Sequence, residues 1–210
     1  MLLAIDTSAG ASVALVDGAR GTLVEHSESD TRSHAEVIGQ LIKRCLDDCA
    51  IGASALSGVA IGMGPGPFTG LRVGIAAAQA FAFGAARPLL RVVSHDAIAF
   101  AHYAAGNRDP LLVVTDARRR EVYVSSFFGV DEFGIPVRAA QPMLCRPEDL
   151  ATTVPGFEMF TRIDSQQVSA AAIGLLAQGL LAQEREFAGP EPLYLRAPDA
   201  TISTGPKRVS

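Results

Sequence analysis

The 210-residue chain carries 18 basic and 22 acidic side chains, giving a formal net charge of −4 and a pI near 5.5, and 49% of its residues are hydrophobic. This length fits one sizeable domain or two smaller ones, with enough apolar residues for a core that needs no disulfides. Three cysteines, an odd number, exclude the paired framework of a small secreted protein and favour a reducing, cytoplasmic setting. The acidic pI argues against independent nucleic-acid binding, because phosphate contacts need a basic surface.

The sequence also lacks the features of exported or membrane-spanning chains. The N-terminal segment MLLAIDTSAG has no basic region and reaches an aspartate after five residues, so we expect no signal peptide. No stretch reaches the ~18 consecutive apolar residues that a membrane span requires. We therefore expect a soluble, cytoplasmic protein.

The first half of the chain mixes short β-type runs with helical patterns. The clusters SAG and DGARG separate the first three runs and indicate tight hairpins. From His34 onward, apolar residues recur at the spacing that lines one helix face. The expected elements are strands at 2–6, 12–16 and 22–25, a helix at 34–49, a strand at 58–62, a helix at 70–85, a strand at 89–93 and a helix at 94–104.

After the run GNRDP, the strongest boundary signal in the chain, the order of elements begins again in shortened form. The expected elements are strands at 111–116, 121–128 and 135–139, a short helix near 147–150, a weak strand near 157–160 and a helix at about 166–186. Three antiparallel strands followed by alternating helices and strands are typical of a ribonuclease H-like lobe. The sequence therefore predicts an α/β fold of two tandem ribonuclease H-like lobes, 1–105 and 106–210, the second shortened, in the actin-like ATPase (ASKHA) architecture.

The segment IGMGPGPFTGLR, residues 61–72, leads from a strand into a helix, which is the place where phosphate-binding loops occur. A Walker loop would have Lys and then Ser or Thr after its last glycine, but here Leu71 and Arg72 follow. The two prolines of the segment also remove two backbone N–H donors. We interpret the segment as a rigid connection, capped by Thr69, that fixes where the next helix starts.

The expected helix at 70–85 is apolar on every side. Its only charged residue is Arg72 and its only amide is Gln79, whereas a surface helix normally has a polar face. Its sixteen residues rise ~24 Å, which is too short for a membrane span. One face must cover the chain's own sheet, so the other is covered either by the second half of the chain or by another protein.

Asp6 and Thr7, at the end of the first strand, are the candidate nucleotide-binding residues. A carboxylate and hydroxyls at this place hold Mg²⁺ and phosphates in actin-like enzymes, but that role needs a glycine-rich turn. The turn here, Ala-Gly-Ala, offers one glycine. Capping of the strand end is the simpler interpretation.

The histidines and cysteines give no pattern that indicates metal binding. His34 and Glu36 are two residues apart, whereas a helix-borne pair of ligands needs three or four. Cys45 and Cys49 lie one helical turn apart, where they extend an apolar stripe. We expect no metal and no cofactor.

Three consecutive arginines, Arg118, Arg119 and Arg120, follow the first strand of the second half. They fit solvated hairpin charges, and they also fit a docking patch for a phosphate or an acidic partner. The pattern leaves both interpretations open, and the role of the tail after Ala200 is open as well.

Five segments together resemble the TsaB family, also called YeaZ: LAIDTSAGASVAL, SHAEVIGQLI, GPGPFTGLRVGIAAAQAFAFG, DARRREVY and PLYLRAPDA. The most specific part is the motif loop, made up of Gly64, Pro65, Gly66, Pro67, Phe68, Thr69 and Gly70. Pro67 stands where a serine is commoner in the family. The resemblance implies a non-catalytic scaffold subunit in the synthesis of threonylcarbamoyladenosine in tRNA, next to the anticodon. It also implies pairing with the catalytic paralogue TsaD and with the ATPase TsaE, and contact with tRNA only through that complex.

In that family the first two helices form much of the pairing surface, which here corresponds to residues 34–49 and 70–85. The expected interface residues are Val37, Leu41, Cys45, Leu71, Val73, Gly74, Ile75, Ala78 and Phe81. An exposed apolar helix also favours a homodimer when the partner is absent. The alternative function is an ATP-dependent small-molecule kinase of the actin-like superfamily, using Asp6 and the loop at 62–70.

Overall fold

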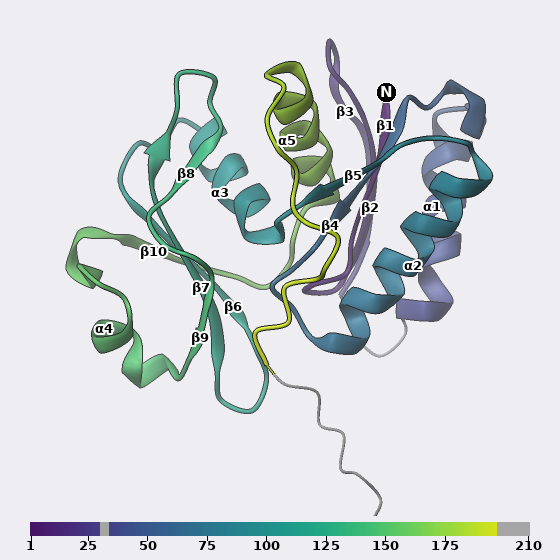
Figure 1. The fold of residues 1–210 in the computed structure, drawn as a ribbon. Helices are drawn as coiled ribbons and strands as arrows, with labels where there is room; N and C mark the ends of the chain where they lie inside the picture. The colour runs from purple at the N-terminus through teal and green to yellow at the C-terminus, as the bar shows by residue number, and fades with distance from the viewer. Residues whose placement is uncertain (30–33, 197–210) are drawn as a thin grey trace, which may run out of the picture.

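Two five-stranded sheets lie side by side in the computed structural model, which describes residues 1–29 and 34–196 (Figure 1). The first sheet has the order β3-β2-β1-β4-β5. Its strands are β1 (Leu2–Asp6), β2 (Ala11–Asp17), β3 (Gly21–Glu28), β4 (Gly58–Gly62) and β5 (Leu89–Val92). β2 is antiparallel to β1 and β3, whereas β4 is parallel to both β1 and β5.

The second sheet repeats the order of the first four strands. Its strands are β6 (Leu111–Asp116), β7 (Val122–Val130), β8 (Pro136–Arg138), β9 (Met143–Cys145) and β10 (Thr161–Ser165). The order β10-β6-β7-β8 stands in place of β4-β1-β2-β3. β7 is antiparallel to β6 and β8, and β10 is parallel to β6. This arrangement confirms the predicted α/β fold with two ribonuclease H-like lobes. Within 1–29 and 34–196, no helix is long and apolar enough to cross a membrane.

The first sheet is covered on both faces, because its strands are apolar on both sides. Leu3 and Ile5 of β1 pack toward α1 (His34–Asp48) and α2 (Phe68–Gly84). Leu2 and Ala4 point the other way, toward α5 (Ala170–Ala182). The central strands therefore read as continuous hydrophobic runs rather than as alternating ones.

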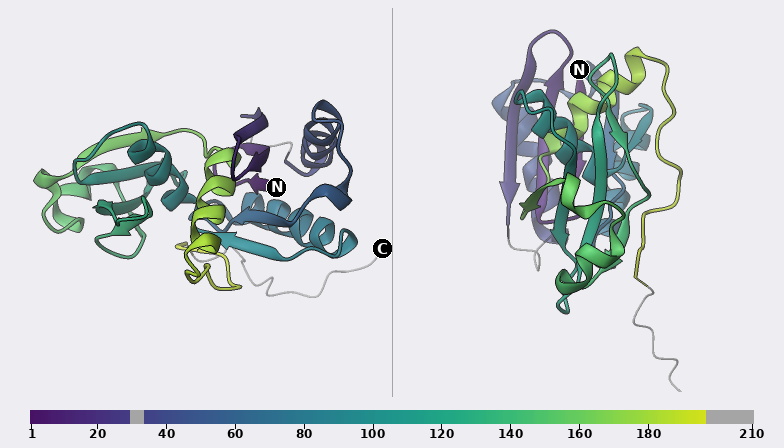
Figure 2. Two further views of the ribbon diagram at one scale, coloured as in Figure 1. Left: turned by 90° about the horizontal axis from the view of Figure 1, so that it is seen from above. Right: turned by 90° about the vertical axis from the view of Figure 1, so that its left-hand side faces the viewer.

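Helices α3 and α5 each cover the sheet that is formed by the other half of the chain. α3 (Ser94–Ala104), from the first half, packs on β6, β7 and β8 of the second sheet. α5, from the second half, packs on β1, β2 and β4 of the first sheet and lies between the lobes (Figure 2). Residues of both sheets and both helices share one hydrophobic core. The division between residues 105 and 106 thus separates the strands of the two sheets but not the helices that cover them.

The outer face of the second sheet has a small core of its own. The 3₁₀ turns η2 (Pro147–Asp149) and η3 (Phe157–Met159) and the short helix α4 (Leu150–Thr153) cover it. The strand expected at 157–160 is wrong: η3 follows Gly156, whose φ of 70° turns the chain, and strand pairing begins only at Thr161. β9, which was not expected, has three residues, too few to show a period-two pattern.

The close fit of α5 on the first sheet is tested by Gly174→Ala. A Cβ at Gly174 would lie 2.6 Å from Val16 Cγ2 and 3.0 Å from Ala4 Cβ. We expect the free energy of unfolding, measured in urea, to fall by about 1–3 kcal/mol through overpacking. Gly179→Ala, on the same helix but with nothing within 4 Å, is the matched control and should raise stability by up to about 1 kcal/mol. Equal effects of the two changes would mean that α5 does not pack closely on this sheet.

Candidate functional site

The carboxylate of Asp6, at the end of β1, is the centre of a buried hydrogen-bond network. Asp6 is 1% exposed. Its Oδ1 accepts hydrogen bonds from Ser8 N (2.8 Å) and Ser8 Oγ (2.6 Å), and its Oδ2 accepts one from Ser94 Oγ (2.6 Å). Burial raises the pKa of Asp6, and the hydrogen bonds from Ser8 and Ser94 act in the opposite direction.

Two more hydrogen bonds tie the motif loop to the end of β1. Gly64 N donates to Ser94 Oγ at 3.0 Å, and Thr7 Oγ1 donates to Gly70 O at 2.8 Å. Ser94 thereby links Asp6 directly to the loop. These hydrogen bonds fix the position of the loop relative to the end of β1. Pro67 rather than the expected Thr69 is the N-cap residue of α2, and the helix begins at Phe68.

Glycine is required at three positions around the loop, because the loop and α2 lie very close to the end of β1 and the residues that follow it. A Cβ at Gly62 would lie 1.8 Å from Asp6 Oδ2, and a Cβ at Gly66 would lie 2.8 Å from Ser8 Cα. A Cβ at Gly74 would lie 2.1 Å from Thr7 Oγ1. The glycines of this segment therefore serve to bring α2 against the β1–β2 turn.

Asp6 and Thr7, the candidate nucleotide-binding residues, are thus engaged in internal packing. Thr7 is as buried as Asp6, and neither side chain lines the cavity between the lobes. The interpretation of Asp6 and Thr7 as a strand-end cap agrees with this geometry. A role in holding Mg²⁺ or phosphate would require the carboxylate to leave Ser8 and Ser94.

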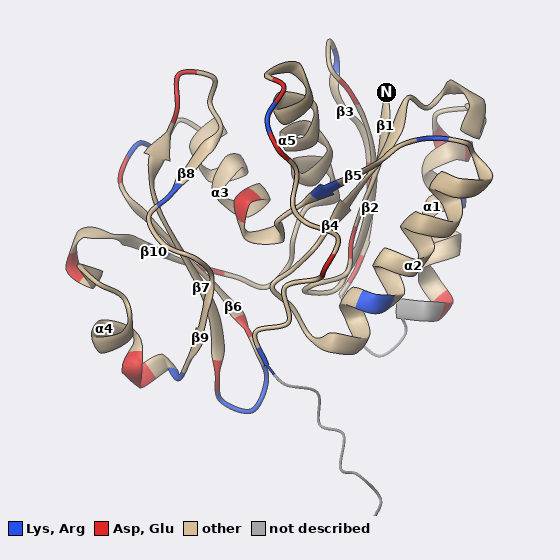
Figure 3. Cartoon of the chain, in the orientation of Figure 1, with Lys and Arg blue, Asp and Glu red and all other residues tan. Residues whose placement is uncertain are grey.

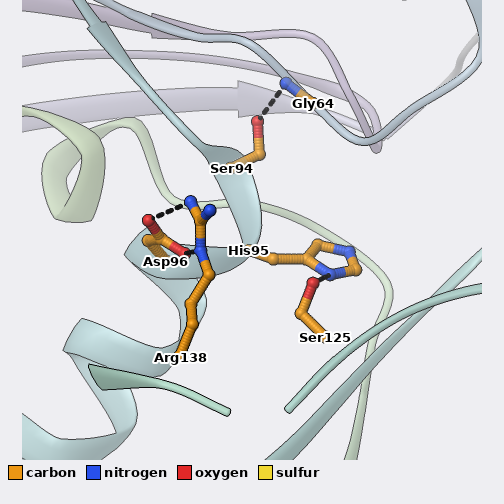
Figure 4. A network of polar contacts seen from close by, with 6 residues as sticks. All are labelled: Gly64, Ser94, His95, Asp96, Ser125 and Arg138. Carbon is orange, nitrogen blue, oxygen red and sulfur yellow. Dashed lines mark hydrogen bonds and ion pairs between the residues drawn. The ribbon is translucent and has the colours of Figure 1, made fainter. Parts of the chain in front are cut away.

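The first turn of α3 joins the two lobes through three consecutive residues (Figure 4). Ser94 binds the first lobe, as described above. His95 places Nδ1 2.8 Å from Ser125 Oγ and Nε2 2.9 Å from Thr115 Oγ1, both on the second sheet. Asp96 accepts two hydrogen bonds from Arg138 of β8, at 2.6 and 2.5 Å. We call these contacts of Ser94, His95 and Asp96 the joint between the lobes. They connect the lobes through polar groups, in addition to the shared hydrophobic core.

A cavity of about 720 Å³ lies where the two lobes meet. The first lobe contributes Ser8 and Thr69 to its wall, and the second contributes Asp116, Arg118 and Asp164. Asp116 ends β6 as Asp6 ends β1, but it is exposed. Among the described residues, no group of three or more His, Cys, Asp or Glu side chains is placed to hold a metal ion.

The three arginines after β6 form a tight turn in an unusual backbone conformation. Arg118, Arg119 and Arg120 have φ values of 63°, 54° and 61°, in the left-handed region that favours glycine. Each such residue costs of order 1 kcal/mol or more. Ala117 N donates to Glu121 O at 2.9 Å and closes the turn. All three arginines are exposed.

The expected interface residues divide into two groups. Six of the nine lie in the core between the first sheet and α1 and α2: Leu41, Cys45, Leu71, Gly74, Ile75 and Ala78. Only Val37, Val73 and Phe81 are partly exposed. Five of these residues have side chains buried within the chain itself, and Gly74 lies against Thr7; their contact with a partner stays a prediction.

The outer face of α2 carries different residues. Ala76, Gln79, Ala80 and Phe83 are exposed, and Phe83 is 89% exposed. We call Ala76, Ala80 and Phe83 the outer α2 face. Sequence reasoning missed it because a helix that is apolar all round has no periodicity to separate its inner side from its outer side. The signal that remained was the single Gln79, which marks the solvent side.

The pH dependence of folding stability tests whether His95 is buried at the joint between the lobes. Complete burial lowers the pKa of His95 to about 3, with a smaller effect from Arg138. The folded state then holds a neutral imidazole, while the unfolded state takes up a proton below about pH 6.5, so stability falls as the pH decreases from there toward 3. We expect this residue to contribute a slope of about 1.4 kcal/mol per pH unit in denaturant titrations at pH 4–6.

His95→Gln should lower stability at neutral pH but remove that slope. His102→Gln, at the last turn of the same helix, is the matched control for loss of one imidazole. If the stability of the His95 variant depended on pH as steeply as that of the wild type, His95 would not be the buried neutral group.

Comparisons with known proteins agree with this architecture. Residues 22–178 match the family model of TsaD, tRNA N6-adenosine threonylcarbamoyltransferase. An uncharacterised protein of Mycobacterium tuberculosis is 36% identical across 95% of this chain and 93% of its own length. TsaB of Haemophilus influenzae, named as a tRNA threonylcarbamoyladenosine biosynthesis protein, is 38% identical over 59% of this chain and 52% of its own length.

Among solved structures, YeaZ from Pseudomonas aeruginosa superposes with a TM-score of 0.74 at 27% identity. The superposition covers 92% of this chain and 99% of that one. This coverage includes both lobes together with α3 and α5, rather than one ribonuclease H-like unit alone. The chain therefore belongs to the family that the TsaD model describes, and the relatives named TsaB together with the shared architecture of YeaZ group it with TsaB (YeaZ) within that family.

Proposed function

We propose that this chain is a non-catalytic subunit in the synthesis of threonylcarbamoyladenosine in tRNA. It pairs with a catalytic TsaD paralogue, works with the ATPase TsaE and meets tRNA within that complex. The names of the TsaB relatives support the pathway. The observation that carries the subunit role is the outer α2 face, an apolar surface that the described part of the chain leaves exposed.

The proposed pairing surface lies on α1 and α2. Its centre is the outer α2 face rather than the set of residues expected from the sequence. Ala76 and Ala80 are small enough for a helix of the partner to approach closely, and Phe83 provides a large apolar anchor beside them. Val37 and Phe81, which are partly exposed, extend the surface. A second copy of the chain would cover the same face when the partner is absent.

The network around Asp6 supports a role without chemistry of its own. In a nucleotide-dependent enzyme of this architecture, the carboxylate at the end of β1 would face the cavity between the lobes. Here it accepts its hydrogen bonds from Ser8 and Ser94, and Thr7 binds the carbonyl of Gly70. No observation favours the kinase alternative, and the reaction is assigned to the partner's active site.

The double change Ala80→Arg and Phe83→Asp tests the pairing surface. Both positions are exposed, so the fold should be retained, while two charges would enter an apolar contact. We expect affinity for the paralogue, measured by titration calorimetry, to fall by at least ~30-fold, as for loss of a central anchor. Modification of tRNA by the reconstituted complex should fall with it.

Phe133→Asp is the matched control, because Phe133 is 50% exposed in the turn between β7 and β8, on the other lobe. It should leave pairing unchanged. Wild-type affinity in the double variant would overturn the assignment of this face. Gly74→Arg would not serve as the test, since a side chain there meets Thr7 and would disturb the fold.

A further inference from the structure

We propose that the arginine turn, Arg118–Arg120 together with Arg196, contacts the phosphate backbone of the tRNA when it is bound to the complex. This inference rests on the proposed function and names the surface by which this subunit meets the substrate. The sequence alone left two interpretations of these three arginines open: solvated hairpin charges and a docking patch. The inference favours the docking patch.

The turn is held in one shape by contacts on both sides. Arg118 N donates to Asp116 Oδ1 at 2.8 Å, and Glu121 N donates to Arg118 O at 3.0 Å. Arg196, near the end of the described chain, forms an ion pair with Glu121 and donates to Arg118 O at 3.3 Å. The guanidinium groups are therefore presented by a closed, braced turn rather than by a loose loop.

The residue types are not those that the backbone prefers. Glycine or asparagine would adopt three successive left-handed conformations at lower cost. Arginine at all three positions is thus unfavourable for the turn itself. Strained residues that persist in a well-braced segment are typical of binding sites.

The charge of the turn is opposite to that of the chain. Four arginines against Asp116 and Glu121 leave an excess of two positive charges here, although the whole chain carries −4 (Figure 3). The large exposed hydrophobic side chains of the described residues all lie outside 116–121. A protein partner would normally need such an anchor, whereas phosphate groups are bound by guanidinium groups alone.

The C-terminal segment connects the arginine turn to the first turn of α2, at the end of that helix opposite to Phe83. Arg72, on the first turn of α2, lies 3.8 Å from the centre of the Phe68 ring and donates to Tyr194 Oη at 3.2 Å. Two residues later in the chain, Arg196 reaches the arginine turn. A tRNA held at the arginine turn would therefore lie toward the start of α2, the helix whose later turns carry the proposed pairing surface.

The test is the double change Arg119→Gln and Arg120→Gln, measured on the complex of the full chain with the TsaD paralogue and TsaE. The probe is an unmodified transcript of a tRNA that the wild-type complex modifies, and its affinity is measured by fluorescence anisotropy between 50 and about 300 mM salt. We expect the slope of log K against log salt to decrease by about 1.5 and affinity at about 150 mM salt to fall roughly 10- to 30-fold. Pairing with the paralogue should stay at the wild-type value.

Two control variants accompany it. Arg20→Gln with Arg108→Gln removes the same charge from the β2–β3 turn and the segment before β6, and should change the slope little. Arg119→Lys with Arg120→Lys keeps the charge and should retain most of the slope, which separates charge from turn geometry.

A wild-type salt slope in the glutamine variant would overturn the inference. Loss of pairing with the paralogue or the ATPase, with the tRNA slope unchanged, would overturn it in favour of an acidic protein partner. Failure of the wild-type complex to form or to modify tRNA would instead overturn the proposed function, so the two failures are distinguishable.

Discussion

The buried carboxylate of Asp6 is the contact on which the arrangement of the first lobe depends. A carboxylate removed from water needs hydrogen bonds to compensate for its lost hydration, and Ser8 and Ser94 supply them from two different parts of the chain. Ser94 also binds the amide of Gly64. The motif loop is held in place for this reason, and with it the start of α2.

The position of α2 connects this network to function. The β1–β2 turn contacts α2 and the motif loop so closely that a Cβ at Gly66 or Gly74 would clash with Ser8 or Thr7. The same contact turns one apolar side of α2 inward and leaves Ala80 and Phe83 outward. The packing that buries Asp6 and Thr7 thus also creates the surface that we propose for the partner.

The two lobes depend on each other because each sheet is covered by a helix from the other half of the chain. α3 and α5 bury residues of both sheets in one core, and His95 and Asp96 add polar contacts to the second sheet. The segment ending at Arg196 makes a third connection, from Met63 and Arg72 of the first lobe to Glu121 of the second. A partner on α2 and a nucleic acid at the arginine turn would therefore bind to parts of one continuous framework.

The sequence by itself determined the order of most elements, but not β9 or η3, together with the α/β class and the motif loop, because hairpin glycines, apolar runs and helical spacing are local patterns. It could not assign α5 to the first sheet or separate Ala80 and Phe83 from Leu71 and Ala78, since both depend on contacts between residues far apart in the chain. It also placed Asp6 among candidates for ligand binding, and only the position of Ser94, 88 residues away, showed that its carboxylate is used internally. Local patterns fix what each segment forms, whereas burial on folding decides which side of it remains available.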